Sequence, residues 1–301
     1  MDKKNIKGNI ILMITALIWG TAFVAQSVGM DYVGPFTFIT VRYIIGGLFL
    51  IPCIYFFDRI NKNTRNKYHD QKALITGGFL CGIVLFVASS FQQIGIKYTT
   101  VGKSGFITAL YIIIVPIIGV LFKKKVSAKV WISVVISIVG LYLLCINESF
   151  SISGGDFLVL ICSFCFSIHI LIIDKYSSIV DAVRMSCIQF FVAGFLGIIP
   201  MIFFEDPKIE NILSAYSPIL YAGVMSSGVA YTFQIIGQKY TSPVLATLIM
   251  SLESVFAALS GWIILGEVLS LKEFIGCSLV FIAIILAQLP EKKKSEFKTK
   301  A

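Results

Sequence analysis

The chain has 301 residues, of which 57% are hydrophobic and 14% are charged, and its net charge is +9. Soluble domains average about 25% charged residues, and a soluble protein with a mean hydropathy of +0.90 would expose large apolar patches. An ordinary soluble domain is therefore excluded. The basic residues gather in short connections and at the two ends, a pattern that argues against a nucleic-acid partner.

Ten continuous apolar runs follow one another along the chain, and most are long enough to cross a bilayer as a helix. The runs do not alternate apolar with polar residues, so strands are not expected. Backbone groups in lipid must then be satisfied within helices. We predict an all-α integral membrane protein with ten transmembrane helices, at residues 9–28, 35–57, 73–94, 104–122, 130–146, 156–173, 180–203, 213–235, 243–265 and 271–289.

Lys and Arg residues are unevenly divided between the two sides of the predicted membrane. With the N-terminus in the cytoplasm, 20 of the 25 lie on the cytoplasmic side, four lie outside, and Arg42 lies within a span. Cytoplasmic loops carry an excess of Lys and Arg. We therefore predict that both termini are cytoplasmic, as an even number of spans requires, and that residues 291–301 form a basic cytoplasmic tail.

The second half of the chain repeats the first. The segment at 91–100 matches the segment at 233–242 at an offset of 142, with seven of ten positions identical. Because each half has an odd number of spans, the second copy must insert upside down. We therefore predict a five-helix repeat at 8–146 and an inverted five-helix repeat at 150–290, an architecture typical of alternating-access carriers.

Two ionisable residues lie inside the predicted spans. Glu253 lies roughly 16 Å into the ninth span, and Arg42 lies about seven residues into the second. Such groups usually face a bundle interior or a water-filled cavity. Glu253 can bind a cation, carry a proton or pair with Arg42, and Arg42 can instead extend to the outer interface. Tyr111 occupies the first-repeat position of Glu253, so we expect these two side chains to face each other across a central cavity.

Three further span residues are candidates for the cavity or its movement. His169 shares a helix face with two cysteines, but three soft ligands on one helix do not predict a metal site, so His169 is expected to line the cavity or to pack. Gln189 lies 147 residues after Arg42 and is a candidate for its inverted equivalent. Pro116 lies mid-span, where proline kinks a helix, either as a static bend or as part of a gate.

Sequence motifs for catalysis are missing from the chain. It contains no P-loop, no dinucleotide fingerprint and no HExxH motif. We therefore predict that the protein is not an enzyme, has no catalytic residues, needs no cofactor and does not power itself with ATP.

Four groups of residues, in this order and spacing, carry a resemblance to a known family. They are Ile18-Trp19-Gly20-Thr21-Ala22-Phe23, Gly34-Pro35 followed by Arg42, Phe106-Ile107-Thr108-Ala109-Leu110-Tyr111 ending at Val115-Pro116, and Ser251-Leu252-Glu253-Ser254-Val255-Phe256-Ala257-Ala258 followed by Leu265-Gly266-Glu267. With them the chain resembles a ten-span member of the drug/metabolite transporter superfamily, of the EamA type. The family often has proline after the ninth-span glutamate. This chain has Ser254 there, so the gate is expected to rest more on Pro116.

The resemblance implies two inverted repeats around a central cavity and the movement of small metabolites driven by gradients. It adds one more cavity candidate from the first span. The side chains that we expect to line or support the cavity are Glu253, Tyr111, His169, Gln189, Arg42 and Trp19.

Together these features predict a secondary transporter in the cell membrane, of bacterial origin, that exports or exchanges a small metabolite, such as an amino-acid-like compound. Its expected partners are this substrate, membrane lipids and a coupling proton or cation, and a homodimer is left open. Two alternatives also stay open: a membrane-embedded lipid-modifying enzyme, which would need a cluster of carboxylates or histidines at one membrane face, and a small-molecule channel, which would not saturate.

Overall fold

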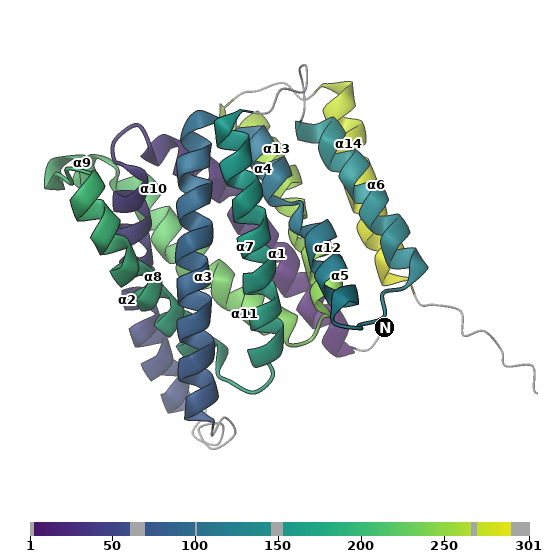
Figure 1. Ribbon diagram of the computed structural model, residues 1–301, viewed down its shortest axis with the longest axis horizontal. Coiled ribbons are helices and arrows are strands. Elements are labelled where there is room, and N and C mark those ends of the chain that lie inside the picture. Colours follow the sequence, from purple (N-terminus) through teal and green to yellow (C-terminus); the bar gives the residue numbers. More distant parts are fainter. Residues whose placement is uncertain (1–2, 61–69, 100, 146–152, 266–269, 290–301) are drawn as a thin grey trace, which may run out of the picture.

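The computed structural model describes residues 3–60, 70–99, 101–145, 153–265 and 270–289. Helices dominate this part of the chain, which contains no strand (Figure 1). The all-α prediction is therefore confirmed for the described residues. The predicted tail at 291–301, residues 266–267 of the ninth-span motif and the junction between the predicted repeats at 146–152 lie outside them.

The helices of the first half are α1 (Lys3–Gly29), α2 (Pro35–Ile60), α3 (Gln71–Tyr98), α4 (Val101–Thr108), α5 (Tyr111–Leu121) and α6 (Ala128–Cys145). Those of the second half are α7 (Gly154–Tyr176), α8 (Ala182–Phe204), α9 (Ile209–Ser214), α10 (Tyr216–Leu220), η1 (Tyr221–Tyr231), α11 (Thr232–Gln238), α12 (Pro243–Met250), α13 (Leu252–Leu265) and α14 (Leu271–Gln288).

Nine helical segments of the described chain are long and apolar enough to cross a membrane. They correspond to nine of the ten predicted spans. The fifth prediction, at 130–146, corresponds to a shorter apolar helix, Ala128–Leu143. Three of the nine segments combine shorter helices, namely α4 with α5, α10 with η1 and α11, and α12 with α13.

Two of these combined segments are interrupted at matching places. The first is interrupted at Ala109–Leu110 and the second at Ser251, and Ala109 and Ser251 are 142 residues apart. Ser254 Oγ donates a hydrogen bond to the Gly105 carbonyl at 3.1 Å, which joins α13 to α4 beside the two interruptions. The second span is thus interrupted even though the residue after Glu253 is serine and not the proline that is common in the family.

The segment η1 is a π-helix of 11 residues, whereas the matching helix α3 is regular throughout. One extra residue explains the difference. Gly82 of α3 lies against the Gln189 carbonyl, and Gly223 of η1 lies against the Arg42 carbonyl, so these glycines correspond at an offset of 141. The matched segments that follow are 142 residues apart. A helix that must hold one more residue widens into π turns.

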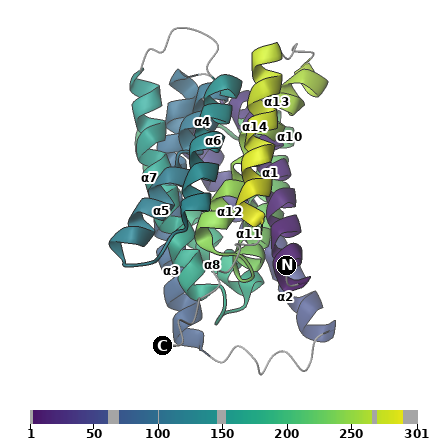
Figure 2. The ribbon, with the colours of Figure 1, turned by 90° about the vertical axis from the view of Figure 1, so that its right-hand side faces the viewer.

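Helices of the two halves pack against each other rather than within separate bodies. α2 packs on α8, α3 on α7 and α8, and α1 on α13, η1 and α11. α6 and α14 pack together at one edge of the bundle, as Figures 1 and 2 show. The main buried cluster draws side chains from both halves, so the centre of the molecule lies at their interface.

Two hydrogen bonds join the halves in corresponding ways. Thr241 Oγ1 donates to Asn9 Oδ1 at 3.0 Å, and Thr99 Oγ1 donates to Asp156 Oδ1. The two threonines are 142 residues apart, and Asn9 and Asp156 are 147 apart. If each residue is replaced by its equivalent in the other half, each of these two hydrogen bonds therefore maps onto the other.

Candidate functional site: a central cavity between the halves

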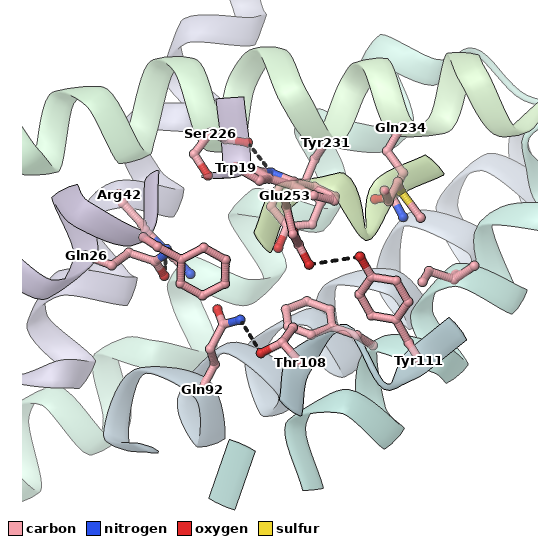
Figure 3. A pocket seen from close by; sticks show the side chains of 14 residues that line it. Trp19, Gln26, Arg42, Gln92, Thr108, Tyr111, Ser226, Tyr231, Gln234 and Glu253 are labelled. Carbon is pink, nitrogen blue, oxygen red and sulfur yellow. Dashed lines mark hydrogen bonds between the residues drawn. The ribbon is translucent and has the colours of Figure 1, made fainter. Parts of the chain in front are cut away.

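A cavity of about 490 Å³, its open mouth included, lies between the two halves of the bundle (Figure 3). Its walls combine aromatic and apolar side chains with amides, hydroxyls and two ionisable groups. The lining residues are Trp19, Phe23, Gln26, Arg42, Gln92, Thr108, Tyr111, Phe166, Ile170, Ser226, Tyr231, Gln234, Met250 and Glu253.

Glu253 and Tyr111 meet in this cavity. Tyr111 Oη donates a hydrogen bond to Glu253 Oε1 at 2.8 Å (Figure 3). Each residue follows a helix interruption, since Tyr111 opens α5 and Glu253 is the second residue of α13. Both are buried, and no ion pair joins Glu253 to a cation in the described structure. The carboxyl group therefore keeps acceptor capacity for a ligand or a proton in the cavity.

Arg42 lies at the other side of the cavity and is only 3% exposed, so it does not extend to the outer interface. Its guanidinium donates to Gln26 Oε1 at 2.8 Å and to Tyr43 Oη at 3.0 Å. It also lies 4.7 Å from the centroid of the Tyr43 ring, a cation–π distance. Tyr43 in turn hydrogen-bonds the Ser89 hydroxyl. All of these partners are neutral, and the pairing of Arg42 with Glu253 considered above does not occur in this structure.

Trp19 forms an aromatic wall with Tyr231. Their ring centroids are 4.7 Å apart, and the indole Nε1 donates to the Ser226 carbonyl at 3.3 Å. Ser226 and Tyr231 both belong to η1. Residues five apart on an α-helix point in directions about 140° apart, whereas a π-helix brings residues i and i+5 onto nearly the same face. The π-helix therefore lets both residues contact one indole.

His169 and Gln189 lie behind this wall and do not line the cavity. Both are fully buried, and His169 Nε2 lies 3.1 Å from Gln189 Oε1, a hydrogen-bonding distance. The imidazole meets the Tyr231 ring edge-on, with centroids 5.9 Å apart. The pair therefore supports Tyr231 from outside the cavity. Pro116 is buried within α5, past the interruption of its span.

Several lining residues were not among the sequence-based candidates, including Gln26, Thr108, Ser226 and Tyr231. For some positions the repeat carried a usable signal. Gln92 and Gln234 both line the cavity, and they are equivalent in the matched segments. The repeat could not indicate the Ser226 carbonyl, because the direction of a backbone carbonyl depends on the local helix geometry and not on the residue type.

Comparison with known proteins identifies the family and the fold. The model of the EamA-like transporter family matches residues 6–146 and 153–289. An uncharacterized transporter of Archaeoglobus fulgidus is 33% identical, over 95% of this chain and 87% of that protein. A chloroplastic WAT1-related protein of Arabidopsis thaliana is 22% identical, over 93% of this chain and 69% of that protein. One solved crystal structure is 17% identical with a TM-score of 0.75, over 93% of this chain and 96% of that one, which shows a common fold.

Proposed function

Because the chain belongs to the EamA-like transporter family, we propose that this multi-pass membrane protein is a secondary transporter that exports or exchanges a small metabolite by alternating access across the cell membrane. The observation that carries the proposal is the cavity between the two halves, beside two interrupted helices. Carriers of this design place the substrate near the bilayer midplane, at the interface of inverted repeats and against discontinuous helices.

The proposed architecture is two inverted five-helix repeats with both termini in the cytoplasm. Three features support it. The contacts Thr241–Asn9 and Thr99–Asp156 correspond when the halves are exchanged, the helix interruptions correspond, and the basic residues favour one side of the membrane. Inversion matters for mechanism because two related halves can adopt alternating conformations around one site.

In this proposal Glu253 and Tyr111 form the polar centre of the transport site. Within the described structure no cationic side chain pairs with the buried Glu253, which favours a ligand that brings an ammonium group or an N–H donor, or a coupling proton or cation. Trp19 and Tyr231 supply an apolar wall for the body of the metabolite. The combination suits a small amphipathic compound, such as an amino-acid-like metabolite.

The test compares the metabolites outside cells that overproduce the wild type, Glu253→Gln or the control Glu210→Gln. Glu210 is exposed on α9, so its variant should behave as the wild type. A compound enriched outside with the wild type and the control, but not with Glu253→Gln, is the expected result. Enrichment with all three would remove Glu253 from the mechanism. If verified membrane insertion produced no enrichment with any of them, and uptake of the same metabolites did not change either, the transporter proposal would fail.

A second measurement separates a carrier from a channel. Reconstituted carrier flux should saturate with substrate, and substrate on the opposite side should accelerate it, because each turnover must return the empty site. Flux that rises without limit and ignores opposite-side substrate would contradict alternating access.

A further inference from the structure

The cavity is nearly symmetric between the halves except where it carries charge. Gln92 and Gln234 line it at equivalent positions, as do Trp19 and Phe166 at an offset of 147. Tyr111 and Glu253 are also equivalent, but only one of them carries a carboxyl group. The symmetric positions would bind a ligand equally well in two opposite orientations. The charged positions therefore determine which orientation the ligand adopts.

Arg42 is the cationic position, and its equivalent in the second half is not charged. That equivalent is Gln189, which lies outside the cavity lining and contacts His169. A second contact supports this assignment, because the glycines beside the two carbonyls, Gly223 and Gly82, also meet Ile45 and Val192, which are again 147 residues apart. The cavity therefore has one cationic wall, supplied by the first half.

No residue in the described part of the chain neutralises the guanidinium of Arg42. Within the described residues, its hydrogen-bond partners are an amide oxygen and a phenol, and no carboxylate lies within ion-pair distance. Its Nε–H finds no hydrogen-bond acceptor among the residues that the structure describes. A buried charge left without a counter-ion is costly. An arginine offers five N–H donors in a fork that matches a planar oxyanion, so a ligand carboxylate would relieve this cost.

We propose that the cavity selects organic carboxylates, with the carboxylate at Arg42 and an apolar, preferably aromatic, body against Trp19 and Tyr231. This inference rests on the proposed transport function and names the class of its substrate. Glu253 lies beyond the carboxylate subsite, and either a ligand ammonium group or a coupling proton can compensate it, so an ammonium group on the ligand is favourable but not required. A cationic ligand that lacks the carboxylate would leave Arg42 uncompensated, and it should be rejected.

Three probes that share a phenylethyl unit separate these cases: 3-phenylpropionate carries the carboxylate alone, phenylalanine carries both groups, and phenethylamine carries the ammonium alone. Binding to the purified full-length protein is followed by Trp19 fluorescence, with Trp131 and Trp262 replaced by Phe. We expect 3-phenylpropionate and phenylalanine to bind at least about tenfold more tightly than phenethylamine, in keeping with the strength of charge-assisted hydrogen bonds.

Variants of Arg42 assign this preference to its side chain. Arg42→Gln should weaken both carboxylate probes by about tenfold or more while leaving phenethylamine unchanged, and Arg42→Lys should retain part of the preference because it keeps the charge but not the fork. The control is Arg184→Gln, since Arg184 pairs with Asp58 at 2.6 Å and does not line the cavity. Thermal unfolding of each variant checks that it is folded, and Arg42→Lys carries the test if Arg42→Gln is not.

Two results would overturn the inference. One is wild-type protein that binds phenethylamine as tightly as 3-phenylpropionate, or that binds none of the three probes. The other is a folded Arg42 variant with unchanged carboxylate affinity. The export experiment keeps the two proposals distinguishable: a metabolite that is exported but has no anionic group would refute the carboxylate subsite and leave the transporter standing.

Discussion

At the scale of single residues, the phenol of Tyr111 makes a specific prediction about transport. It donates a hydrogen bond to Glu253 inside the cavity, and it is buried. Tyr111→Phe keeps the ring but removes this donor, and a hydrogen bond to a charged carboxylate contributes about 1.5–3 kcal/mol. We expect the initial rate of export to fall about tenfold or more.

The matched control is Tyr216→Phe, because Tyr216 is exposed at the start of α10. Equal rates for the two variants would show that the bond has no part in transport.

The same residues show how far the sequence could predict the site. The offset of the repeat placed Tyr111 opposite Glu253, and the two side chains do touch. Their role in transport remains a prediction. The sequence could not indicate that Arg42 would pair with Gln26 rather than with Glu253. Nothing in the residue pattern fixes which neighbour a long side chain reaches, because the relative positions of three helices determine it.

At the scale of the elements, the N-terminus of α2 is capped by a residue from the other half. Glu205, at the end of α8, accepts hydrogen bonds from the backbone N–H groups of Phe36 and Thr37, both at 2.8 Å. A carboxylate at this end also matches the helix dipole. The approach requires a glycine, since a Cβ at Gly34 would lie 2.2 Å from the carboxyl carbon of Glu205. The cap therefore fixes α2 to α8 at one end of their contact.

Because Glu205 lies so close to Gly34, one methyl group added at this glycine should destabilise the protein. Gly34→Ala should displace the Glu205 carboxylate and cost about 1–2 kcal/mol, the usual value of a helix cap. Such a loss lowers the unfolding temperature by roughly 2–8 °C. Thermal unfolding in detergent measures the change. Gly154→Ala is the control because no described residue lies within 4 Å of the added methyl group. The cap would be unimportant if both variants unfolded at the same temperature.

The π-helix η1 makes the next prediction, because its extra residue can be removed. Deletion of Gly228 should convert the segment to an α-helix, so that Ser226 and Tyr231 no longer contact the same indole. We expect an altered emission spectrum of Trp19, measured with the other two tryptophans replaced by Phe, and loss of export. Met225→Leu, in the same segment and partly exposed, is the control. A folded deletion variant with unchanged spectrum and export would show that the π-helix does not position the aromatic wall.

Helix existence could be predicted from the sequence far better than helix interruption. The apolar runs indicated every helical span now described, since burial in lipid forces the backbone into helices. The interruptions at Ala109–Leu110 and at Ser251 contain no proline and were not predicted. Tertiary contacts such as the bond from Ser254 to Gly105 accompany them. Such helix interruptions depend on the residues that pack beside them, so the local sequence predicts them poorly.

At the scale of the whole molecule, the repeat relates contacts as well as sequences. Gly95 lies against Val159, and its equivalent Gly237 lies against Leu12. Each pair joins a helix of one half to the first helix of the other. The helices of the two halves are therefore packed directly on one another. Neither half alone would bury the helix faces that form these contacts. Movement of a helix of one half would therefore disturb packing in the other half.

The last prediction concerns how the halves lie in the membrane. Lys97 and Lys239 are equivalent in the matched segments, at the end of α3 and just after α11. If the repeats are inverted, these positions lie on opposite sides. Lys97→Cys should react with a membrane-impermeant maleimide on intact cells, whereas Lys239→Cys should react only after the membrane is opened. Lys208→Cys is the control for the outer side and Lys124→Cys for the inner side, and both lysines are exposed. Labelling of positions 97 and 239 from the same side would refute the inverted arrangement, and with it the basis for two alternating halves around one cavity.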